Sequence, residues 1–365
     1  MIRVYNDEFY KNKAKKISFE KKYVELICKH ARKVNTKDTL ASTDVVSLYS
    51  RITTSIKSFH TLHNNIFKCL PQSFEELLSL SPSKMAKIYY ILSIQTNDCI
   101  KNDIVQLFFY TFYQWGKKNY KPDFVEKNIL LDYDFFYKDI SSYILDAKNS
   151  DIFSFTTCFY CNSAYINMYY NKSNIERHKF DIEHFIPKDK IKICPLFSLS
   201  LYNFVPSCHF CNSSIKKSNV YFNDSSLYEI TKLFPTNKDY NFDKELKFKI
   251  TPNNFKFINN QDFYYADHVK DFNIELKPEG NNYKIYKKES VFFEIIERYE
   301  CHKKEFLSYI DKRRKYNESY FDLYEKKCSS AESNNLREAI FNTKLRKDTS
   351  PIFYKIYNDI DHDIY

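Results

Sequence analysis

Two closely spaced pairs of cysteines are the residues of this 365-residue chain with the clearest capacity for chemistry. They are Cys158 with Cys161 and Cys208 with Cys211, and 46 residues separate the two pairs. Two residues between cysteines let both thiolates of a tight turn face one ion, and two such turns complete a tetrahedral site. Four thiolates leave no open coordination position, so we predict a structural zinc ion held by all four. Buried cysteines without a metal are the alternative.

A carboxylate and an imidazole stand side by side between the cysteine pairs, at Glu183 and His184. Metal-assisted hydrolysis of a phosphodiester needs this combination, because the carboxylate holds a hard divalent cation and the imidazole takes a proton from the attacking water. On a strand the two side chains point to opposite faces, but at the end of a strand both can turn toward one cleft. Taken alone, such a pair is more typical of a solvated surface.

The order of these motifs is more informative than any one of them. A CxxC pair is followed by Glu-His with a proline three residues after the histidine, and then by Asn-x-Val-Pro-x-Cys-x-x-Cys-Asn-x-x-x-Lys. Over residues 155–217 this order resembles the HNH endonucleases, in the four-cysteine subgroup whose ββα-metal core is held by a zinc knuckle.

The resemblance implies a role for each matching residue. Glu183 would bind the catalytic metal ion, and His184 would be the general base. Asn203 would order the loop and the base, and Asn212 would be the second metal ligand at the head of the helix. At the position of Asn212 the family uses either histidine or asparagine. An amide oxygen is a hard ligand, so we expect Mg²⁺ or Mn²⁺ as the catalytic ion. A glutamate in place of the more common aspartate makes the ligand one methylene longer.

Four further residues near the motif are candidates for a role in the site. Asp181 lies two residues before Glu183 on the same strand face, either as a further metal ligand or as a structural aspartate. Lys188 and Lys216 are placed to contact phosphates, although lysine is abundant throughout the chain. His209 lies between the second pair of cysteines and is expected to be structural.

A second, fainter likeness covers part of the C-terminal third. Residues 294–302 and 312–316 resemble the helical tail of HNH proteins in Septu-type antiphage defence pairs, in which an HNH subunit works beside an SMC-like ATPase. This resemblance implies a separate ATPase partner. A core-facing helix with a solvated basic face is the alternative.

The chain has only two glycines, Gly116 and Gly280. A Walker loop needs two glycines five apart, a dinucleotide-binding loop needs three within six residues, and a nucleophile elbow needs two around a serine. We therefore exclude a glycine-cradled nucleotide cofactor and a GxSxG hydrolase. Any ATP hydrolysis must come from another polypeptide.

The formal net charge of +10 is unevenly distributed. Residues 1–150 carry 23 basic and 16 acidic side chains, and residues 151–250 carry 13 and 10. This bias is typical of a chain that binds a polyanion, and we expect DNA as the partner. The excess of lysine and tyrosine also fits an A+T-rich genome, and a modest positive charge aids solubility.

Neither a membrane span nor a signal peptide is expected. No apolar run approaches the roughly 20 residues that a span needs, and charged residues recur within the first eight positions. We therefore expect a soluble, cytoplasmic protein whose cysteines are free or metal-bound rather than disulfide-paired.

The pattern of apolar residues predicts an α+β protein. Residues 1–150 are expected to form a helical region that binds a partner or substrate. Residues 151–222 are expected to form the HNH nuclease core with its zinc knuckle, and residues 223–365 a mixed region of small β hairpins followed by helices.

Within these regions, Ser73 and Ser83 are predicted to start helices, and a helix is predicted from residue 102 to a cap at Gly116.

In the C-terminal region, alternating residues predict strands at 246–250, 255–258, 272–276 and 283–286. The last two would form a hairpin in which Gly280 supplies a positive φ. A single long helix is predicted from about residue 290 to about residue 314.

Together these features predict a metal-dependent HNH endonuclease that hydrolyses DNA phosphodiester bonds as the effector of a bacterial antiphage defence system. A non-catalytic zinc-knuckle protein that binds nucleic acid or serves as a scaffold is the alternative.

Overall fold

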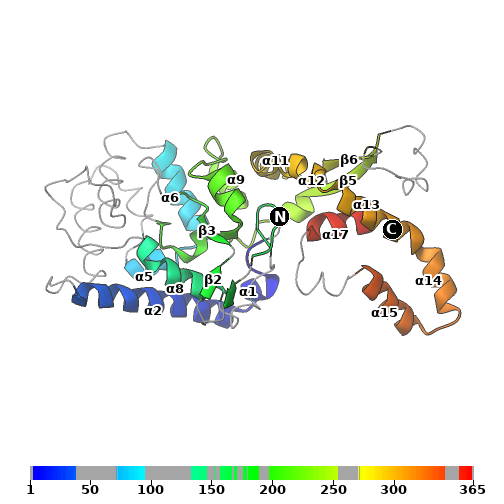
Figure 1. Ribbon diagram of the computed structural model, residues 1–365. Helices are drawn as coiled ribbons and strands as arrows, with labels where there is room; N and C mark the ends of the chain where they lie inside the picture. The colour runs from blue at the N-terminus through cyan, green and yellow to red at the C-terminus, as the bar shows by residue number, and fades with distance from the viewer. Residues whose placement is uncertain are drawn as a thin grey trace.

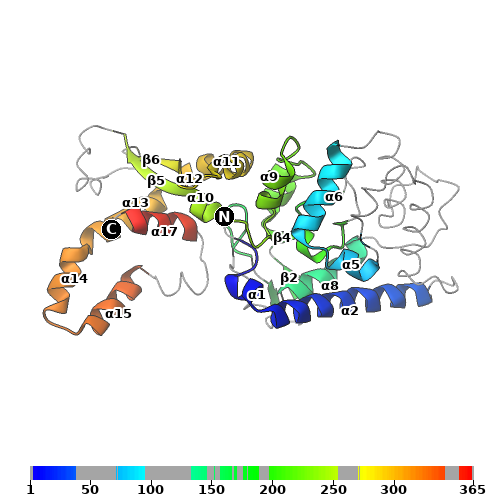
Figure 2. The ribbon, with the colours of Figure 1, turned by 180° about the vertical axis from the view of Figure 1, so that it is seen from behind.

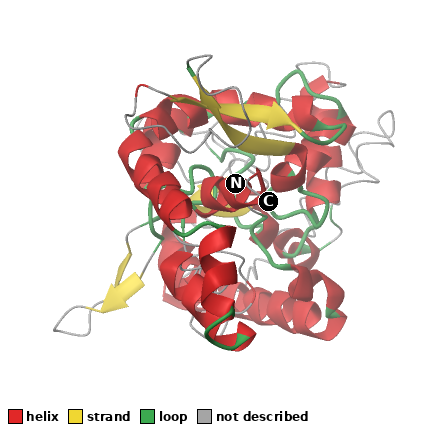
Figure 3. Ribbon diagram, turned by 90° about the vertical axis from the view of Figure 1, so that its right-hand side faces the viewer, coloured by secondary structure: helices red, strands yellow, loops and turns green. Residues whose placement is uncertain are grey.

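The computed structural model describes residues 3–37, 71, 73–94, 133–145, 152, 157–166, 168–170, 176–178, 180–188, 197–253, 270, 272–341 and 353–363. The helix predicted from residue 102 to Gly116 and the strand predicted over 255–258 lie outside these residues. The chain folds as an α+β protein, as predicted, and the described residues form three small antiparallel strand pairs among many helices. Figure 3 shows how small the strands are beside the helices that surround them.

The described part of the N-terminal region is helical. Its helices are α1 (Asp7–Lys11), α2 (Lys13–Lys37), α5 (Phe74–Leu78), α6 (Pro82–Ile94) and α8 (Tyr133–Leu145). The Ser73 hydroxyl caps α5 by accepting a 3.1 Å hydrogen bond from the amide of Glu76, as predicted. Ser83 lies inside α6, because Pro82 already takes the first helical position, where a missing N–H costs nothing.

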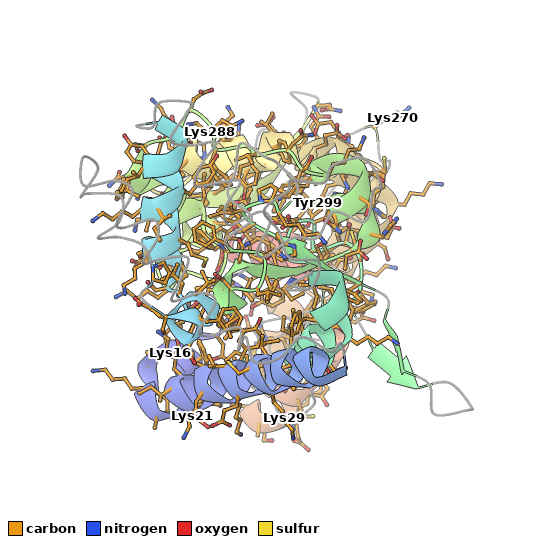
Figure 4. All side chains as sticks on the ribbon, turned by 90° about the vertical axis from the view of Figure 1, so that its left-hand side faces the viewer. Lys16, Lys21, Lys29, Lys270, Lys288 and Tyr299 are labelled. Carbon is orange, nitrogen blue, oxygen red and sulfur yellow. The ribbon has the colours of Figure 1, made fainter. Side chains whose placement is uncertain are left out.

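Helix α2 buries one face and exposes the other. Phe19, Tyr23 and Ile27 recur at helical spacing and are buried. Lys21 and Lys29 project from the opposite side of the helix (Figure 4).

The central region holds two strand pairs. Strand β1 (Met168–Tyr170) pairs with β2 (Glu176–His178), and β3 (Asp181–His184) pairs with β4 (Phe204–Ser207). A single 3-10 turn, η3 (Leu201–Asn203), leads into β4, and a π-helical segment, η4 (Phe210–Lys216), follows it. The order β3, β4, η4 is therefore two antiparallel strands and then a helix.

The C-terminal region contains one longer strand pair and most of the remaining helices. Strands β5 (Leu246–Pro252) and β6 (Phe272–Pro278) pair along their whole length. The helices are α9 (Leu227–Leu233), α10 (Phe242–Glu245), α11 (Tyr283–Phe292), α12 (Ile295–Glu300), α13 (Lys303–Lys315), α14 (Glu318–Glu325), α15 (Ser330–Phe341) and α17 (Tyr354–Asp363).

The hairpin predicted through Gly280 is wrong, because residues 283–286 begin helix α11. Ile285, Tyr286 and Glu289 are its buried residues, at helical spacing, and a four-residue alternation was too short to tell helix from strand. Among the described residues no glycine has a positive φ. Gly280 instead lies against the carboxylate of Glu245, where a Cβ atom would overlap the carboxylate oxygens.

The single helix predicted over residues 290–314 is also wrong. Glu294 adopts a left-handed conformation with φ 52° and separates α11 from α12. A second break at Cys301 and His302 separates α12 from α13. These two breaks make α12 a separate short helix between α11 and α13.

The helices lie on two sides of the central strands. Helices α2, α5, α6 and α8 cover one side of the β3 region, whereas β5, β6 and helices α11 to α17 lie on the other (Figures 1 and 2). One continuous set of buried apolar side chains runs from Val4 to Ile360 through all three regions. Among the described helices none is long and apolar enough to cross a membrane.

Candidate metal centre and adjoining Glu-His site

The four predicted metal ligands come together in the fold. The sulfur atoms of Cys158, Cys161, Cys208 and Cys211 all lie within 4.8 Å of one another, and all four residues are buried. Two of these sulfurs, on Cys161 and Cys208, are 3.9 Å apart. Ligands of one tetrahedral ion with metal–sulfur bonds of about 2.3 Å would be about 3.8 Å apart. The cysteine cluster therefore fits a single metal ion bound by all four thiolates.

The first cysteine turn is shaped to present its thiolates. The Asn162 amide donates to the Cys158 carbonyl at 2.9 Å, and Asn162 itself adopts a left-handed φ of 51°. The next amide, of Ser163, donates to the Cys161 sulfur at 3.4 Å. Hydrogen bonds from the other three thiols lower the pKa of Cys161, whereas burial raises the pKa of Cys158.

The predicted Glu-His pair ends strand β3. Glu183 faces Val205 and His184 faces Phe204 across the strand pair. Strand β4 then runs directly into the second cysteine turn and η4, so the cysteine cluster joins the strand pair to the helix that follows it.

His184 is buried at 6% exposure, and its ring orientation is fixed. Its Nε2 atom lies 2.9 Å from the carbonyl oxygen of Ser198, and the ring meets Phe204 edge-on at 5.3 Å. A carbonyl can only accept, so Nε2 must donate, and the neutral ring then carries its lone pair on Nδ1. Burial, followed by the positive charge of Lys188, lowers the pKa of His184 to about 3.

Asn203 fixes the loop beyond β3. Its side-chain oxygen accepts a 2.8 Å hydrogen bond from the Ile186 amide, and its side-chain nitrogen donates to the carbonyls of Ile186 and Phe197 at 3.0 and 3.1 Å. Its own carbonyl accepts from the Phe185 amide at 2.9 Å. Asn203 thus contacts Ile186, two residues after His184, and Phe197, the neighbour of the Ser198 that accepts the His184 hydrogen bond.

Both carboxylate oxygens of Glu183 have partners inside the protein. Its carboxylate is 2% exposed; one oxygen accepts a 2.6 Å hydrogen bond from the Tyr160 hydroxyl, and the other forms an ion pair with Lys216. The Lys216 ammonium also donates to the His184 carbonyl at 2.8 Å. Burial raises the pKa of Glu183, whereas the ammonium and the phenol lower it.

Asn212 is engaged elsewhere, at the surface. Its side-chain nitrogen donates to Asp181 at 3.0 Å, and the same Asp181 oxygen lies 3.0 Å from Nδ1 of His209 and 3.4 Å from the Ser213 hydroxyl. Asp181 is therefore the centre of a polar group at the start of η4.

The two lysines expected to contact phosphate lie in different settings. Lys188 is half-buried and close enough to His184 to influence its pKa. Lys216 is fully buried against Glu183, so a phosphate would reach its ammonium only by displacing that carboxylate.

The residues expected to hold a catalytic cation do not fit one in this arrangement. Both oxygens of Glu183 already face donors, and Asn212 turns its amide to Asp181 rather than to Glu183. A divalent cation needs several oxygen atoms converging on one point. Glu183 has an ammonium group where such a cation would bind.

Three residues that sequence reasoning did not single out complete the metal centre. Tyr160 lies inside the first cysteine turn and reaches Glu183. Arg298 donates to the Cys211 sulfur at 3.1 Å, and Tyr299, buried in the interior (Figure 4), donates to the Cys161 carbonyl at 2.8 Å. The sequence could have indicated a role for Tyr160, because this residue lies between two of the predicted metal ligands. Arg298 and Tyr299 lie far along the chain, in the segment 294–302 that resembles a Septu-type tail, and nothing in the sequence linked them to the cysteines.

No known protein family, curated protein or solved structure matches this chain.

Proposed function

We propose that this chain is an HNH-type endonuclease that hydrolyses phosphodiester bonds of DNA, with His184 as the general base. The observation that carries the proposal is the fixed imidazole at the end of β3, which is held by the Ser198 carbonyl, while Asn203 holds the adjacent residues Ile186 and Phe197. A strand pair joined to a helix by four clustered cysteines is the setting that the HNH resemblance calls for.

The proposed step at His184 is a proton transfer. With Nε2 donating to Ser198, the Nδ1 lone pair can take a proton from a water molecule that attacks phosphorus. A pKa of about 3 keeps the imidazole neutral at neutral pH. An approaching phosphate favours the charged ring and raises that pKa toward the range of an effective base.

We infer that the ion of the cysteine cluster is zinc and that its role is structural. Four thiolate ligands suit zinc, and they leave no position for water or substrate. The resemblance calls for Mg²⁺ or Mn²⁺ as a second, catalytic ion, but Glu183 and Asn212 do not fit that ion as they stand.

We further propose that the nuclease works with a separate ATPase in antiphage defence. Support comes from the likeness of residues 294–302 and 312–316 to Septu-type tails and from the two-glycine composition, which excludes a Walker loop in this chain. An ATPase gene beside this one, and copurification of its product, are the expected findings.

Plasmid nicking tests the nuclease proposal. The wild type, supplied with Mg²⁺ or Mn²⁺, is expected to nick supercoiled DNA, and His184→Ala is expected to lose at least about 100-fold of that rate with unchanged zinc content and circular dichroism. His302→Ala removes a partly exposed histidine away from the site and serves as the matched control. A His184→Ala protein that nicks at the wild-type rate would refute the proposal.

A second candidate function is a non-catalytic zinc-knuckle protein that binds nucleic acid or serves as a scaffold. The buried ion pair between Glu183 and Lys216 favours this candidate, because a carboxylate neutralised in the interior can have a purely structural role. This candidate predicts DNA binding that is unaffected by brief EDTA treatment and no cleavage by the wild type with either ion.

A further inference from the structure

Two consecutive residues of α12 contact both halves of the cysteine cluster. Arg298 donates from its guanidinium to the sulfur of Cys211, at 3.1 Å, across 87 positions of sequence. Tyr299 donates from its hydroxyl to the carbonyl of Cys161, at 2.8 Å. Each of the two cysteine turns is therefore held by one residue of the same short helix.

Arg298 makes a second contact with the same turn. Its guanidinium carbon lies 5.0 Å from the centre of the Phe210 ring, which is within the range of a cation–π interaction. Phe210 is two residues from Cys208 and adjacent to Cys211. The guanidinium thus contacts a ligand sulfur and the aromatic residue beside it, which fixes its position.

The charge of the cluster explains why a cation is needed there. A divalent ion with four thiolates has a formal charge of −2, and a net charge in a buried site costs desolvation energy unless an opposite charge offsets it. A guanidinium that donates directly to sulfur offsets part of it and forms a charge-assisted hydrogen bond. Within the described part of the chain, Arg298 is the cation that the hydrogen bonds place on a ligand sulfur.

The first cysteine turn is also attached to the C-terminal helix α17. The carbonyl of Asn162, directly after Cys161, accepts a 2.7 Å hydrogen bond from the Phe353 amide. The side-chain oxygen of Asn162 accepts from the Lys355 amide at 3.2 Å. The start of α17 therefore depends on the left-handed turn that the cysteine pair imposes.

Strand β5 connects α12 with α17, because its residue Phe248 contacts both helices. The Phe248 ring stacks on Tyr299, with centres 4.8 Å apart. The Phe248 amide donates to Asp359 of α17 at 2.8 Å. Helix α12, strand β5 and helix α17 thus form one connected unit, which contacts the two cysteine turns at Cys161, Asn162 and Cys211.

We propose that Arg298 is the outer-sphere cation of the zinc centre, and that α12 and α17 dock stably on the core only when the cysteine cluster holds its ion. Arg298 acts as a positioning residue, through Cys211. The proposal stands whether or not the chain cleaves DNA, because it concerns the metal and the docking of the C-terminal region alone.

Zinc release from the full-length, zinc-loaded protein tests the role of Arg298. A metallochromic dye follows zinc after a chelator is added. Arg298→Gln keeps a polar side chain but loses the charge, and we expect release about 10- to 100-fold faster than in the wild type. Arg337→Gln is the matched control. Like Arg298, Arg337 of α15 stacks on an aromatic ring and donates a hydrogen bond, but its partners are Phe321 and the Glu318 carboxylate of α14. Equal release rates for the wild type and Arg298→Gln would overturn the proposal.

Cobalt substitution measures a property of the metal site that would not change if Arg298 had only a structural role. The sulfur-to-cobalt charge-transfer band of the Co²⁺-loaded protein should shift in Arg298→Gln and stay unchanged in Arg337→Gln. Arg298→Lys keeps the charge and should restore part of the slow zinc release. A lysine variant that loses zinc as fast as Arg298→Gln would overturn the charge role.

Hydrogen exchange of the wild type keeps the proposal testable if Arg298 variants fail to fold. Removing zinc from the intact protein should deprotect the amides of α12 and of residues 353–363 together with the cysteine turns. Helices α12 and α17 that keep full protection in the metal-free protein would overturn the coupling.

Discussion

The hydroxyl of Tyr160 donates a 2.6 Å hydrogen bond to the carboxylate of Glu183. Tyr160 lies between two cysteines of the cluster, and Glu183 lies next to His184 at the end of β3. The metal centre and the Glu-His pair are therefore not two neighbouring sites but one hydrogen-bonded unit, in which the shape of a cysteine turn decides where a carboxylate points.

Removing this hydrogen bond should destabilise the fold. Tyr160→Phe leaves one oxygen of a buried carboxylate without its donor, and we expect the free energy of unfolding to fall by about 1–3 kcal/mol. Urea denaturation measures it, with zinc content as a check that the cluster is intact. Tyr165→Phe alters an exposed tyrosine of the same turn region and should change little. An equal stability for Tyr160→Phe and the wild type would contradict the expected role.

The buried pair of Glu183 and Lys216 should show strong coupling. Glu183→Gln or Lys216→Met alone leaves a buried charge without its partner, which costs about 3–5 kcal/mol. The double variant removes both charges, so its loss should be much smaller than the sum of the two single losses. A double-mutant cycle in urea measures this difference, and additive losses would show that the pair is not coupled.

Loss of the cluster's ion should destabilise the whole chain. Cys158→Ser or Cys211→Ser removes a ligand, and we expect zinc content, solubility and thermal stability to fall together, because metal binding and folding are linked. Cys301→Ser changes an exposed cysteine away from the cluster and serves as the control. A Cys211→Ser protein with wild-type zinc content and melting temperature would argue against the four-thiolate site.

Glu289 should make stability depend on pH. Burial raises its pKa from 4.5 to about 8, and its carboxyl group accepts hydrogen bonds from Tyr240 and Tyr221. Between about pH 5 and pH 8 the unfolded chain ionises this group while the folded chain keeps it protonated. The free energy of unfolding should therefore fall as pH rises through this window, by up to about 1.4 kcal/mol per unit.

Denaturation of Glu289→Gln checks this assignment. The neutral amide removes the titration, so the decline in stability between about pH 5 and pH 8 should become shallower than in the wild type. Glu325→Gln alters an exposed glutamate of α14 and should keep the wild-type slope. If Glu289→Gln and the wild type have the same slope, Glu289 does not carry the effect.

The sequence predicted those parts of the site in which spacing alone decides geometry. Two residues between cysteines suffice for a chelating turn, so the convergence of Cys158, Cys161, Cys208 and Cys211 could be predicted. The cap at Ser73 was predictable for the same reason, because a cap is a local contact. The class of the fold followed from the mixture of helical and alternating patterns.

Long-range contacts decided what the sequence could not indicate. The partner of Glu183 is Lys216, 33 residues away, and Asn212 turned to Asp181 rather than to the carboxylate expected beside it. Gly280 lies against the Glu245 carboxylate, which would have to move to admit a Cβ atom, a contact across the end of a strand pair. The break at Glu294 follows no glycine or proline signal. It separates α11 from α12, the helix whose Arg298 and Tyr299 reach the cysteine turns.

The N-terminal helices also bear on His184, through helix α2. The hydroxyl of Tyr23 donates to the carbonyl of Leu199 at 2.6 Å, one residue from the Ser198 carbonyl that holds the imidazole. The hydroxyl of Tyr202 reaches back to Glu20 of α2 at the same distance. Cutting out residues 151–222 would therefore remove the hydrogen bonds from α2 to the chain beside Ser198, and under the nuclease proposal the excised piece should not cleave DNA even if it binds zinc.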